Sequence, residues 1–397
     1  MSILASVPLA PRDPILGLTE QFAADPRPGK VNLGVGVYLD ENGKVPLLEC
    51  VRVAEQQLAA VPTPRGYLPI DGMASYNTAV RELIFGAGSE AVGSGRVVTI
   101  EALGGTGALK IGAEFLKIAS EQRKLLISDP SWENHQALFG RAGFDVSAYR
   151  YYDPQRRGID IDGMLADLAA AEPGTIVVLH ACCHNPTGYD LTSAQWEQVA
   201  QVVVDRGLVP FLDLAYQGFA ADVEADAAVP RRFATLGVPV LIASSFSKSF
   251  SLYGERVGGL SIVTADADEA ARVLSQVKIA VRTTYSNPPT HGAALVSRVL
   301  GDATLRAQWD AELGAMRDRI KAMRRSLREG LEAQGITDMG FVTEQVGMFS
   351  YCGLSAQQMQ ELREVHGVYG TDAGRICVAA LNPANVEAVA EAIAAVR

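Results

Sequence analysis

The sequence predicts an α/β fold, in which a mostly parallel seven-stranded sheet is covered by helices on both faces. Short apolar runs that end in Gly, Asp, His or Ser alternate along the chain with longer amphipathic stretches, as in parallel sheets buried under helices. The chain has 397 residues, of which 48% are hydrophobic, enough for one large core and a smaller satellite. We therefore expect a large domain that contains the sheet and a smaller α+β domain.

Seven apolar runs are the candidate strands of the large domain. Between the fourth and the fifth of them, Thr192 and Gln195 form a potential capping box and Gly207 provides a stop, which predicts a helix over Ser193–Arg206. The seven runs are Arg96–Glu101, Lys124–Ser128, Val146–Tyr151, Thr175–His180, Leu208–Leu214, Val238–Ser244 and Val257–Val263.

A long charged pattern introduces the smaller domain. Its amphipathic spacing predicts one extended helix from Ala303 to about Leu331. Strand-like pieces at Gly347–Cys352 and Arg375–Ala379 then alternate with helices at 355–366 and 384–396. We find no internal repeat and no long flexible linker, so both domains are expected to be compact.

Composition narrows the class of protein. The net charge is −10, which argues against nucleic acid as a partner and favours small molecules. Five cysteines, scattered apart from one adjacent pair, do not resemble a disulfide framework. The first residues lack a basic signal region, and no stretch approaches the roughly 20 apolar residues of a membrane helix. We expect a cytoplasmic protein with no membrane partner.

Polar residues follow several of the candidate strands, where ligands bind in open parallel sheets. After the first strand, Gly104, Gly105 and Thr106 precede a helix whose start suits a phosphate. The pattern matches neither a P-loop nor GxGxxG, and a purely steric need for glycine explains it equally well.

The sequence HACCHNPTG at 180–188 follows the fourth strand and invites a metal interpretation. A metal site is disfavoured, because the adjacent Cys182 and Cys183 do not easily converge on one ion and no second pair follows. Instead, Asn185 and Pro186 indicate a tight turn that presents a side-chain amide.

Two ionisable residues, Asp213 and Lys248, complete the set of polar residues at the ends of the candidate strands. Asp213 ends the next apolar strand with Tyr216 three residues later, and Lys248 lies in ASSFSKSFSLYGER at 243–256. A carboxylate on a buried strand implies a cationic partner, although a helix cap or structural ion pair is equally open. A desolvated lysine suits Schiff-base chemistry, although most loop lysines are solvated.

The conjunction of these residues favours pyridoxal 5′-phosphate (PLP). A phosphate site, an amide, a carboxylate with a tyrosine, and a lysine followed by Arg256 all occur at strand ends. The cofactor needs a lysine for its aldehyde, an anion site for its phosphate, and a carboxylate for its ring nitrogen. A nucleotide-dependent oxidoreductase has only the glycine turn in its favour, and a non-catalytic binding module would not need the lysine.

Eleven motifs together resemble the fold-type I PLP enzymes, specifically the class I aspartate and aromatic-amino-acid aminotransferases, and most closely the bacterial aromatic (tyrosine) branch. The motifs are DPILGL (13–18), KVNLGVGVY (30–38), YLPIDG (67–72), GGTGAL (104–109), SDPSWENH (128–135), HACCHNPTG (180–188), DLAYQGF (213–219), SFSKSFSLYGERVGG (245–259), YSNPP (285–289), GMFSY (347–351) and GR (374–375).

The resemblance implies a role for each matching residue. Lys248 would bind the cofactor covalently and move the proton at the substrate α-carbon, with Asp213 and Tyr216 as the other catalytic residues. Asp213 would pair with the ring nitrogen, while Asn185 and Tyr216 would bind the phenolic oxygen. The remaining cofactor-binding residues would be Gly105, Thr106, Ser245 and Arg256 at the phosphate, Trp132 stacked on the ring, and Tyr67. Trp132 is equally compatible with a place in the core.

The resemblance also implies a substrate site. Arg375 would hold the α-carboxylate as a bidentate pair, and Arg282 of a neighbouring subunit would reach the distal carboxylate of a dicarboxylic substrate. Val35 and Phe349 would line the side-chain pocket, with Gly36, Trp132 and Asn185 as further substrate contacts. Asp372, within TDAG, departs from the family pattern, and a solvent-facing orientation is expected for it.

The implied enzyme is a homodimer with shared active sites. It would transfer amino groups between tyrosine, phenylalanine or dicarboxylic amino acids and 2-oxoglutarate; the alternative is an aspartate aminotransferase, and a lyase of the same fold remains open. The implied domains are an N-terminal arm onto the partner subunit (1–11), a small domain (12–38 and 315–397) and a large cofactor-binding domain (39–314).

Overall fold

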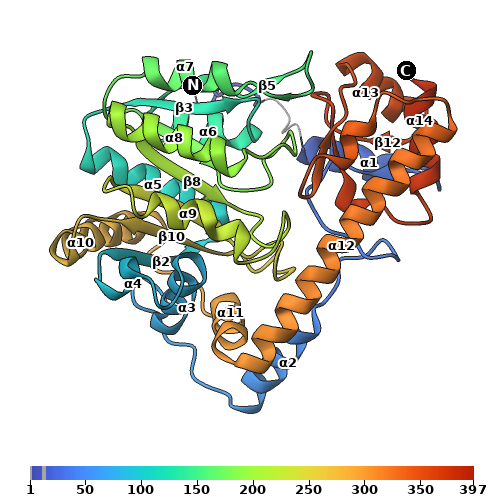
Figure 1. Ribbon diagram of the computed structural model, residues 1–397. Coiled ribbons are helices and arrows are strands. Elements are labelled where there is room, and N and C mark those ends of the chain that lie inside the picture. Colours follow the sequence, from blue (N-terminus) through green and yellow to red (C-terminus); the bar gives the residue numbers. More distant parts are fainter. Residues whose placement is uncertain (1, 11–14) are drawn as a thin grey trace.

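A seven-stranded sheet forms the centre of the computed structural model, which describes residues 2–10 and 15–397 (Figure 1). The strand β10 is antiparallel to both of its neighbours, whereas the other adjacent pairs are parallel. In spatial order the strands are β2 (Val97–Leu103), β10 (Val257–Val263), β9 (Val240–Ser245), β8 (Val209–Leu214), β7 (Ile176–His180), β3 (Lys124–Asp129) and β4 (Asp145–Arg150). The mostly parallel sheet predicted from the sequence is confirmed.

The seven predicted strands are all present, with shifts at their ends. β10 has the predicted bounds, while β9 begins at Val240 rather than at Val238. Val240 is the first β9 residue with a partner, Val263, in the ladder with β10. The apolar residues therefore begin two positions before the hydrogen-bonded strand, at Val238 and Pro239, which is why a hydrophobic run overestimates this boundary.

Helices cover both faces of the sheet, because side chains alternate along each strand. Leu241 packs in one apolar cluster, with residues of α5 (Gly104–Ala119) and α10 (Ala267–Thr284). The next residue, Ile242, packs in the other cluster, with α7 (Ile161–Ala170) and α8 (Ser193–Arg206). The capping box of α8 forms as predicted, and its C-cap Gly207 is left-handed, with φ of 61°.

The long helix α12 (Ala303–Ala333) crosses the molecule from the α2 and α11 side to a smaller group of elements at the right of Figure 1. That group combines helices with two small sheets and packs α14 against α12. It comprises α1 (Leu16–Ala24), α13 (Ala356–Glu364), α14 (Val386–Ala395), the parallel pair β1 (Val31–Asn32) and β12 (Val368–Tyr369), and the antiparallel pair β11 (Phe349–Tyr351) and β13 (Arg375–Cys377).

The two strands predicted for this region are shorter than expected. Residues 378 and 379, assigned to a strand from the sequence, belong instead to the 3₁₀ turn Val378–Ala380, because the β11–β13 ladder contains only three residue pairs. The remaining elements are α2 (Glu49–Ala60), α3 (Ala74–Phe85), α4 (Glu90–Gly93), α6 (Glu133–Arg141), α9 (Ala228–Phe233), α11 (His291–Gly301), β5 (Tyr152–Asp153), β6 (Gly158–Ile159) and the 3₁₀ turns Ala225–Ala227 and Gly340–Thr343.

Two further sequence expectations concern membrane helices and the N-terminal residues. Among the described residues, none of the helices has the length and apolar character needed to cross a bilayer. The expected arm at 1–11 and the DPILGL stretch lie partly outside the described residues.

Candidate active site

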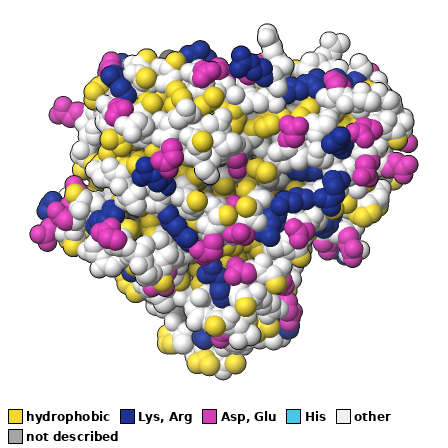
Figure 2. Space-filling model, viewed as in Figure 1, with side chains coloured by type: hydrophobic (Ala, Val, Ile, Leu, Met, Phe, Trp, Pro, Cys, Tyr) yellow, Lys and Arg dark blue, Asp and Glu magenta, His cyan; other side chains and the backbone are white. Residues whose placement is uncertain are grey.

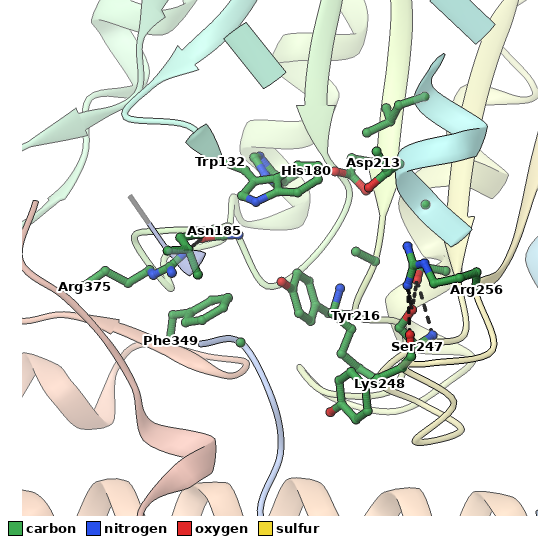
Figure 3. A pocket seen from close by; sticks show the side chains of 18 residues that line it. Trp132, His180, Asn185, Asp213, Tyr216, Ser247, Lys248, Arg256, Phe349 and Arg375 are labelled. Carbon is green, nitrogen blue, oxygen red and sulfur yellow. Dashed lines mark hydrogen bonds between the residues drawn. The ribbon is translucent and has the colours of Figure 1, made fainter. Parts of the chain in front are cut away.

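A cavity of about 230 Å³ lies at the carboxyl ends of the parallel strands (Figure 3). It brings together twelve of the fifteen residues singled out in the sequence. These are Gly36, Gly105, Thr106, Trp132, Asn185, Asp213, Tyr216, Ser245, Lys248, Arg256, Phe349 and Arg375. Residues that are far apart in the sequence converge because the strand ends share one edge of the sheet.

Lys248 projects into this cavity from the loop after β9. Its Nζ lies 4.6 Å from the centre of the Tyr216 ring. Desolvation lowers the pKa of Lys248 to about 8, and the charge of Arg256 acts in the same direction while that of Asp213 opposes it. A large fraction of this lysine is therefore neutral near pH 8, which makes it a nucleophile and a base.

Asp213 is the penultimate residue of β8 and is 5% exposed. Its Oδ2 lies 3.0 Å from Nε2 of His135, whose Nδ1 lies 2.9 Å from the Ser131 hydroxyl. Burial alone would raise the pKa of Asp213, but the hydrogen bond with His135 and nearby positive charges hold it below the ordinary value. The cavity thus contains a carboxylate that stays ionised and can stabilise a positive charge.

The start of α5 forms a potential anion cradle. The sequence placed the glycine turn before this helix, whereas Gly104, Gly105 and Thr106 form its first turn. Gly104 has φ of +68°, and a Cβ there would lie 2.5 Å from Nη2 of Arg256. Glycine is therefore required for both backbone conformation and space. The free N–H groups of the first turn and the Arg256 guanidinium face the same region, which suits a phosphate.

Ser247 contacts the guanidinium of Arg256, and Ser245 in turn contacts Ser247. Arg256 Nη1 donates to Ser247 Oγ at 3.3 Å and to the Tyr253 carbonyl at 3.0 Å. The Ser245 hydroxyl lies 3.3 Å from the Ser247 hydroxyl. Figure 3 shows this group below the cradle, beside Lys248. Ser247, to which the sequence assigned no role, thus orients Arg256.

Arg375 forms the far wall of the cavity and is 1% exposed. It donates to Asn185 Oδ1 and to the Gly34 carbonyl, both at 2.9 Å, and its Nε is buried with no hydrogen-bond partner. Its guanidinium also lies over the Phe349 ring, 4.4 Å from the centroid. A buried guanidinium with an unpaired N–H is suited to bind a carboxylate that enters the cavity.

Phe349 and Trp132 give the cavity apolar walls near this arginine. A Cβ on Gly36 would lie 2.7 Å from the Phe349 ring, so a side chain at position 36 would displace the phenylalanine. Tyr216 contacts Phe349 edge to face, with ring centroids 6.0 Å apart. Trp132 contacts the His135 ring in the same manner. The walls suit a flat apolar group.

Three of the residues singled out in the sequence do not line this cavity. Tyr67 and Arg282 line a second cavity of about 980 Å³, together with residues 285–290, and Tyr67 is 96% exposed. Arg282 donates to the Ser286 hydroxyl. Val35 lines neither cavity, although its neighbour Gly36 lines the first. Within one chain, Tyr67 and Arg282 are therefore separate from Lys248.

Three side chains of the site were missed in the sequence. His135, the partner of Asp213, lies in the SDPSWENH motif, so the motif itself was the available signal. Glu133 of the same motif lies 3.7 Å from Nη1 of Arg375. His180 lines the cavity with both ring nitrogens buried and unpaired, and burial lowers its pKa to about 3. His180 also lies in a matching motif, HACCHNPTG, but a histidine at the end of an apolar strand is not otherwise distinguished from a core residue.

The cysteine pair is closer to a ligand geometry than the sequence suggested. Potential ligand atoms of Cys182, Cys183 and Asp226 all lie within 4.8 Å of one another. The Asp226 carboxylate, however, already accepts hydrogen bonds from the backbone N–H groups of Gly218, Ala220 and Ala221. We therefore interpret Asp226 as a structural residue that stabilises the backbone of its own loop by hydrogen bonds.

Asp372 does not face the cavity. It forms an ion pair with Arg363 at 2.9 Å, and its side chain is 54% exposed. The expected solvent-facing orientation is confirmed, and the carboxylate adds no negative charge beside Arg375.

Comparisons with known proteins agree with this geometry. The family model described as aminotransferase class I and II matches residues 28–393. The chain is 57% identical over 394 residues to an aspartate aminotransferase of Pseudomonas aeruginosa, and 50% identical over 386 residues to an aromatic-amino-acid aminotransferase of Escherichia coli; the alignments cover 99% and 97% of each protein, respectively. The crystal structure of an aromatic-amino-acid aminotransferase from Burkholderia pseudomallei, covalently bound to pyridoxal phosphate, superposes with a TM-score of 0.97 at 62% identity, with both chains fully covered.

Proposed function

The chain belongs to the class I and II aminotransferases, and from this premise we propose that it transfers amino groups from tyrosine and phenylalanine, as well as from dicarboxylic amino acids, to 2-oxoglutarate. The family is PLP-dependent, and the protein is accordingly an aminotransferase with this cofactor. The observation that carries the proposal is the convergence of Lys248, Asp213, Arg256 and Arg375 on one cavity.

The residues present fit the cofactor. The α5 start and Arg256 offer a phosphate site in which a Cβ on Gly104 would collide with the guanidinium. Asp213 offers an ionised carboxylate, and Lys248 offers an amine with a lowered pKa. When bound, PLP supplies an electron sink that stabilises negative charge at the substrate α-carbon.

The chain's own residues divide the remaining work. Lys248 would hold and move the proton at the α-carbon, for which an amine with a pKa of about 8 is well matched. Asp213, kept ionised by His135, would preserve a positive charge on the ring nitrogen. Asn185 and Tyr216 would donate to the phenolic oxygen, and Asn185 also orients Arg375.

Arg375 would bind the α-carboxylate of every amino acid substrate. Its bonds with Asn185 and Gly34 fix the guanidinium plane, and its Nε remains available. The rest of the substrate would then lie between Phe349 and Trp132, which form apolar walls suited to an aromatic ring. These walls favour the proposal that the protein accepts aromatic amino acids over the alternative that it is an aspartate aminotransferase.

The distal carboxylate of a dicarboxylic substrate needs a further cation. Arg256 and Arg375 are the only arginines that line the first cavity among the described residues. Arg282 of a second copy would supply the missing charge, and Tyr67 of that copy would reach the cofactor. We therefore propose a cytoplasmic homodimer with shared sites, in which residues 1–11 form an arm, 12–38 and 315–397 a small domain, and 39–314 the cofactor-binding domain.

Steady-state kinetics tests the substrate proposal. The measurement is kcat/KM for tyrosine, phenylalanine and aspartate, each with 2-oxoglutarate as acceptor. Turnover of the aromatic amino acids comparable to that of aspartate supports it, whereas negligible aromatic turnover makes the protein an aspartate aminotransferase. Product analysis for a 2-oxo acid without release of CO₂ excludes a lyase of the same fold.

A separate experiment tests the assignment of the lysine. Borohydride reduction of the holoenzyme, followed by peptide mapping, should place the cofactor on Lys248. Attachment to another lysine would refute the proposed arrangement of the site.

A further inference from the structure

A second cationic cavity, which Lys248 does not line, lies against the middle of α12. Its volume is about 240 Å³. One wall is α12, another is the segment 343–347, and Phe219 contributes from the large body of the molecule. Figure 2 shows Lys and Arg side chains gathered in a band over the part of this face where α12 passes.

Four cations of α12 line this cavity, namely Arg317, Lys321, Arg324 and Arg325. The spacing of 317, 321 and 325 places three of them on one helix face, because residues four apart are neighbours. Among the described residues, no Asp or Glu lines this cavity. The cations therefore repel one another without a carboxylate of the cavity to offset them.

Arg324 has no carboxylate partner among the residues that the structure describes. It is 2% exposed and donates only to backbone carbonyls, those of Val342, Gly347 and Phe349. Its Nε is buried with no hydrogen-bond partner. Burial lowers the pKa of Arg324 to about 10. A buried guanidinium without a carboxylate is costly, and an anion nearby would offset that cost.

The other cations leave the cavity open to a ligand. Arg317 donates to the Gly218 carbonyl at 3.0 Å. Lys321 and Arg325 are exposed, and neither forms a side-chain hydrogen bond or ion pair with another described residue. Two free cations beside a buried third match a ligand with two negative charges.

Size and overall charge define the class of ligand. A cavity of about 240 Å³ admits a small molecule rather than a polymer segment. The protein has a net charge of −10, which disfavours nucleic acid at this surface. We propose that the cavity between α12 and residues 343–347 is a binding site for a compact dianion of the phosphate or dicarboxylate class.

The site lies close to the substrate cavity without sharing its residues. Arg324 holds the carbonyl of Phe349, whose ring lines the first cavity, while none of the four α12 cations lines that cavity. Variants at the exposed cations therefore leave Lys248, Arg256 and Arg375 unchanged.

Calorimetric titration of the holoenzyme tests the proposal, with inorganic phosphate and glutarate as separate probes at constant ionic strength. The test variant is Lys321→Gln with Arg325→Gln. The control is Arg141→Gln with Arg272→Gln, which removes the same charge from exposed positions that line none of the described cavities. Anions bound at Arg375 contribute equally to all three proteins.

We expect at least one probe to bind the test variant about tenfold more weakly than the wild type, equivalent to about 1.4 kcal/mol, with the control unchanged. The probe that is affected identifies the source of the dianion. Equal weakening in both variants, a change below about threefold, or no saturable binding to the wild type would overturn the proposal. Melting curves and the cofactor absorbance confirm that each variant is folded and loaded.

Discussion

Replacement of Arg375 by Ala removes the group that we propose binds the substrate α-carboxylate. The side chain is 1% exposed, so it acts in a poorly solvated cavity. A bidentate pair contributes two charge-assisted hydrogen bonds of about 1.5–3 kcal/mol each. Their loss corresponds to about 3–6 kcal/mol, or a fall in kcat/KM of about 10² to 10⁴-fold. Because every amino acid substrate has this carboxylate, tyrosine and aspartate should lose the same factor.

The assay is kcat/KM for tyrosine and for aspartate, each with 2-oxoglutarate as acceptor. Arg375→Lys is the matched variant, because it keeps the charge but loses the planar fork, and it should fall between the wild type and Arg375→Ala. Asn185 and Gly34 lose a donor in both variants, so melting temperatures separate instability from lost binding. A loss below about tenfold, or one confined to a single substrate class, would refute the role assigned to Arg375.

Four further predictions concern residues of the proposed cofactor and substrate sites. The pKa of Lys248 is about 8, below the unfolded value of 10.5. The rate at which the apoprotein binds PLP, measured by absorbance, should therefore increase as pH rises through about 8. A midpoint of this rate increase near pH 10 would contradict the prediction. Relative to Lys248→Ala, the wild-type apoprotein should gain stability as pH rises from about 8 to 10.5, because the unfolded lysine still binds a proton that the folded lysine has lost; a difference in melting temperature between the two proteins that stays constant with pH would contradict this. Arg282→Asp should reduce kcat/KM for aspartate at least about tenfold more than for phenylalanine, and equal losses would show that Arg282 is misplaced. Gly36→Ala, whose Cβ would lie 2.7 Å from the Phe349 ring, should raise KM for phenylalanine by roughly tenfold, at a cost of about 1–3 kcal/mol for overpacking; an unchanged KM would mean that the ring is not a substrate wall.

The sheet was predictable from the sequence because local pattern and global topology agree. Buried parallel strands must be apolar on both faces, and each apolar run therefore predicts a strand directly. The antiparallel direction of β10 was missed, because it is set by the short connection at 246–256, which contains no helix, and the apolar pattern of the strand itself carries no signal of direction. The short pair β11 and β13 was overestimated for a related reason, since its apolar residues continue past the last paired residue.

Some residues of the candidate site were likewise predictable from the sequence, and others were not. Lys248, Asp213 and Asn185 were found because charged or amide side chains are conspicuous at the end of an apolar strand. His135 was missed because its contact with Asp213 joins residues 78 positions apart. His180 was missed because it continues an apolar strand, where burial alone explains a histidine. A contact between distant segments has no local signature, and only the fold brings it into view.

The locations of the arginines bear on substrate choice more than their number does. Arg375 lies in the same cavity as Lys248, so the recognition of an α-carboxylate that we propose for it would require only one chain. Arg282 lies in a different cavity of that chain, beside the highly exposed Tyr67. If the proposed dimer forms, recognition of a distal carboxylate depends on a residue that another subunit brings to the site. An aromatic ring needs no such charge, and in the proposed arrangement Phe349 and Trp132 would supply its contacts. The two substrate classes would therefore use the same α-carboxylate clamp but respond differently to any change at the subunit interface.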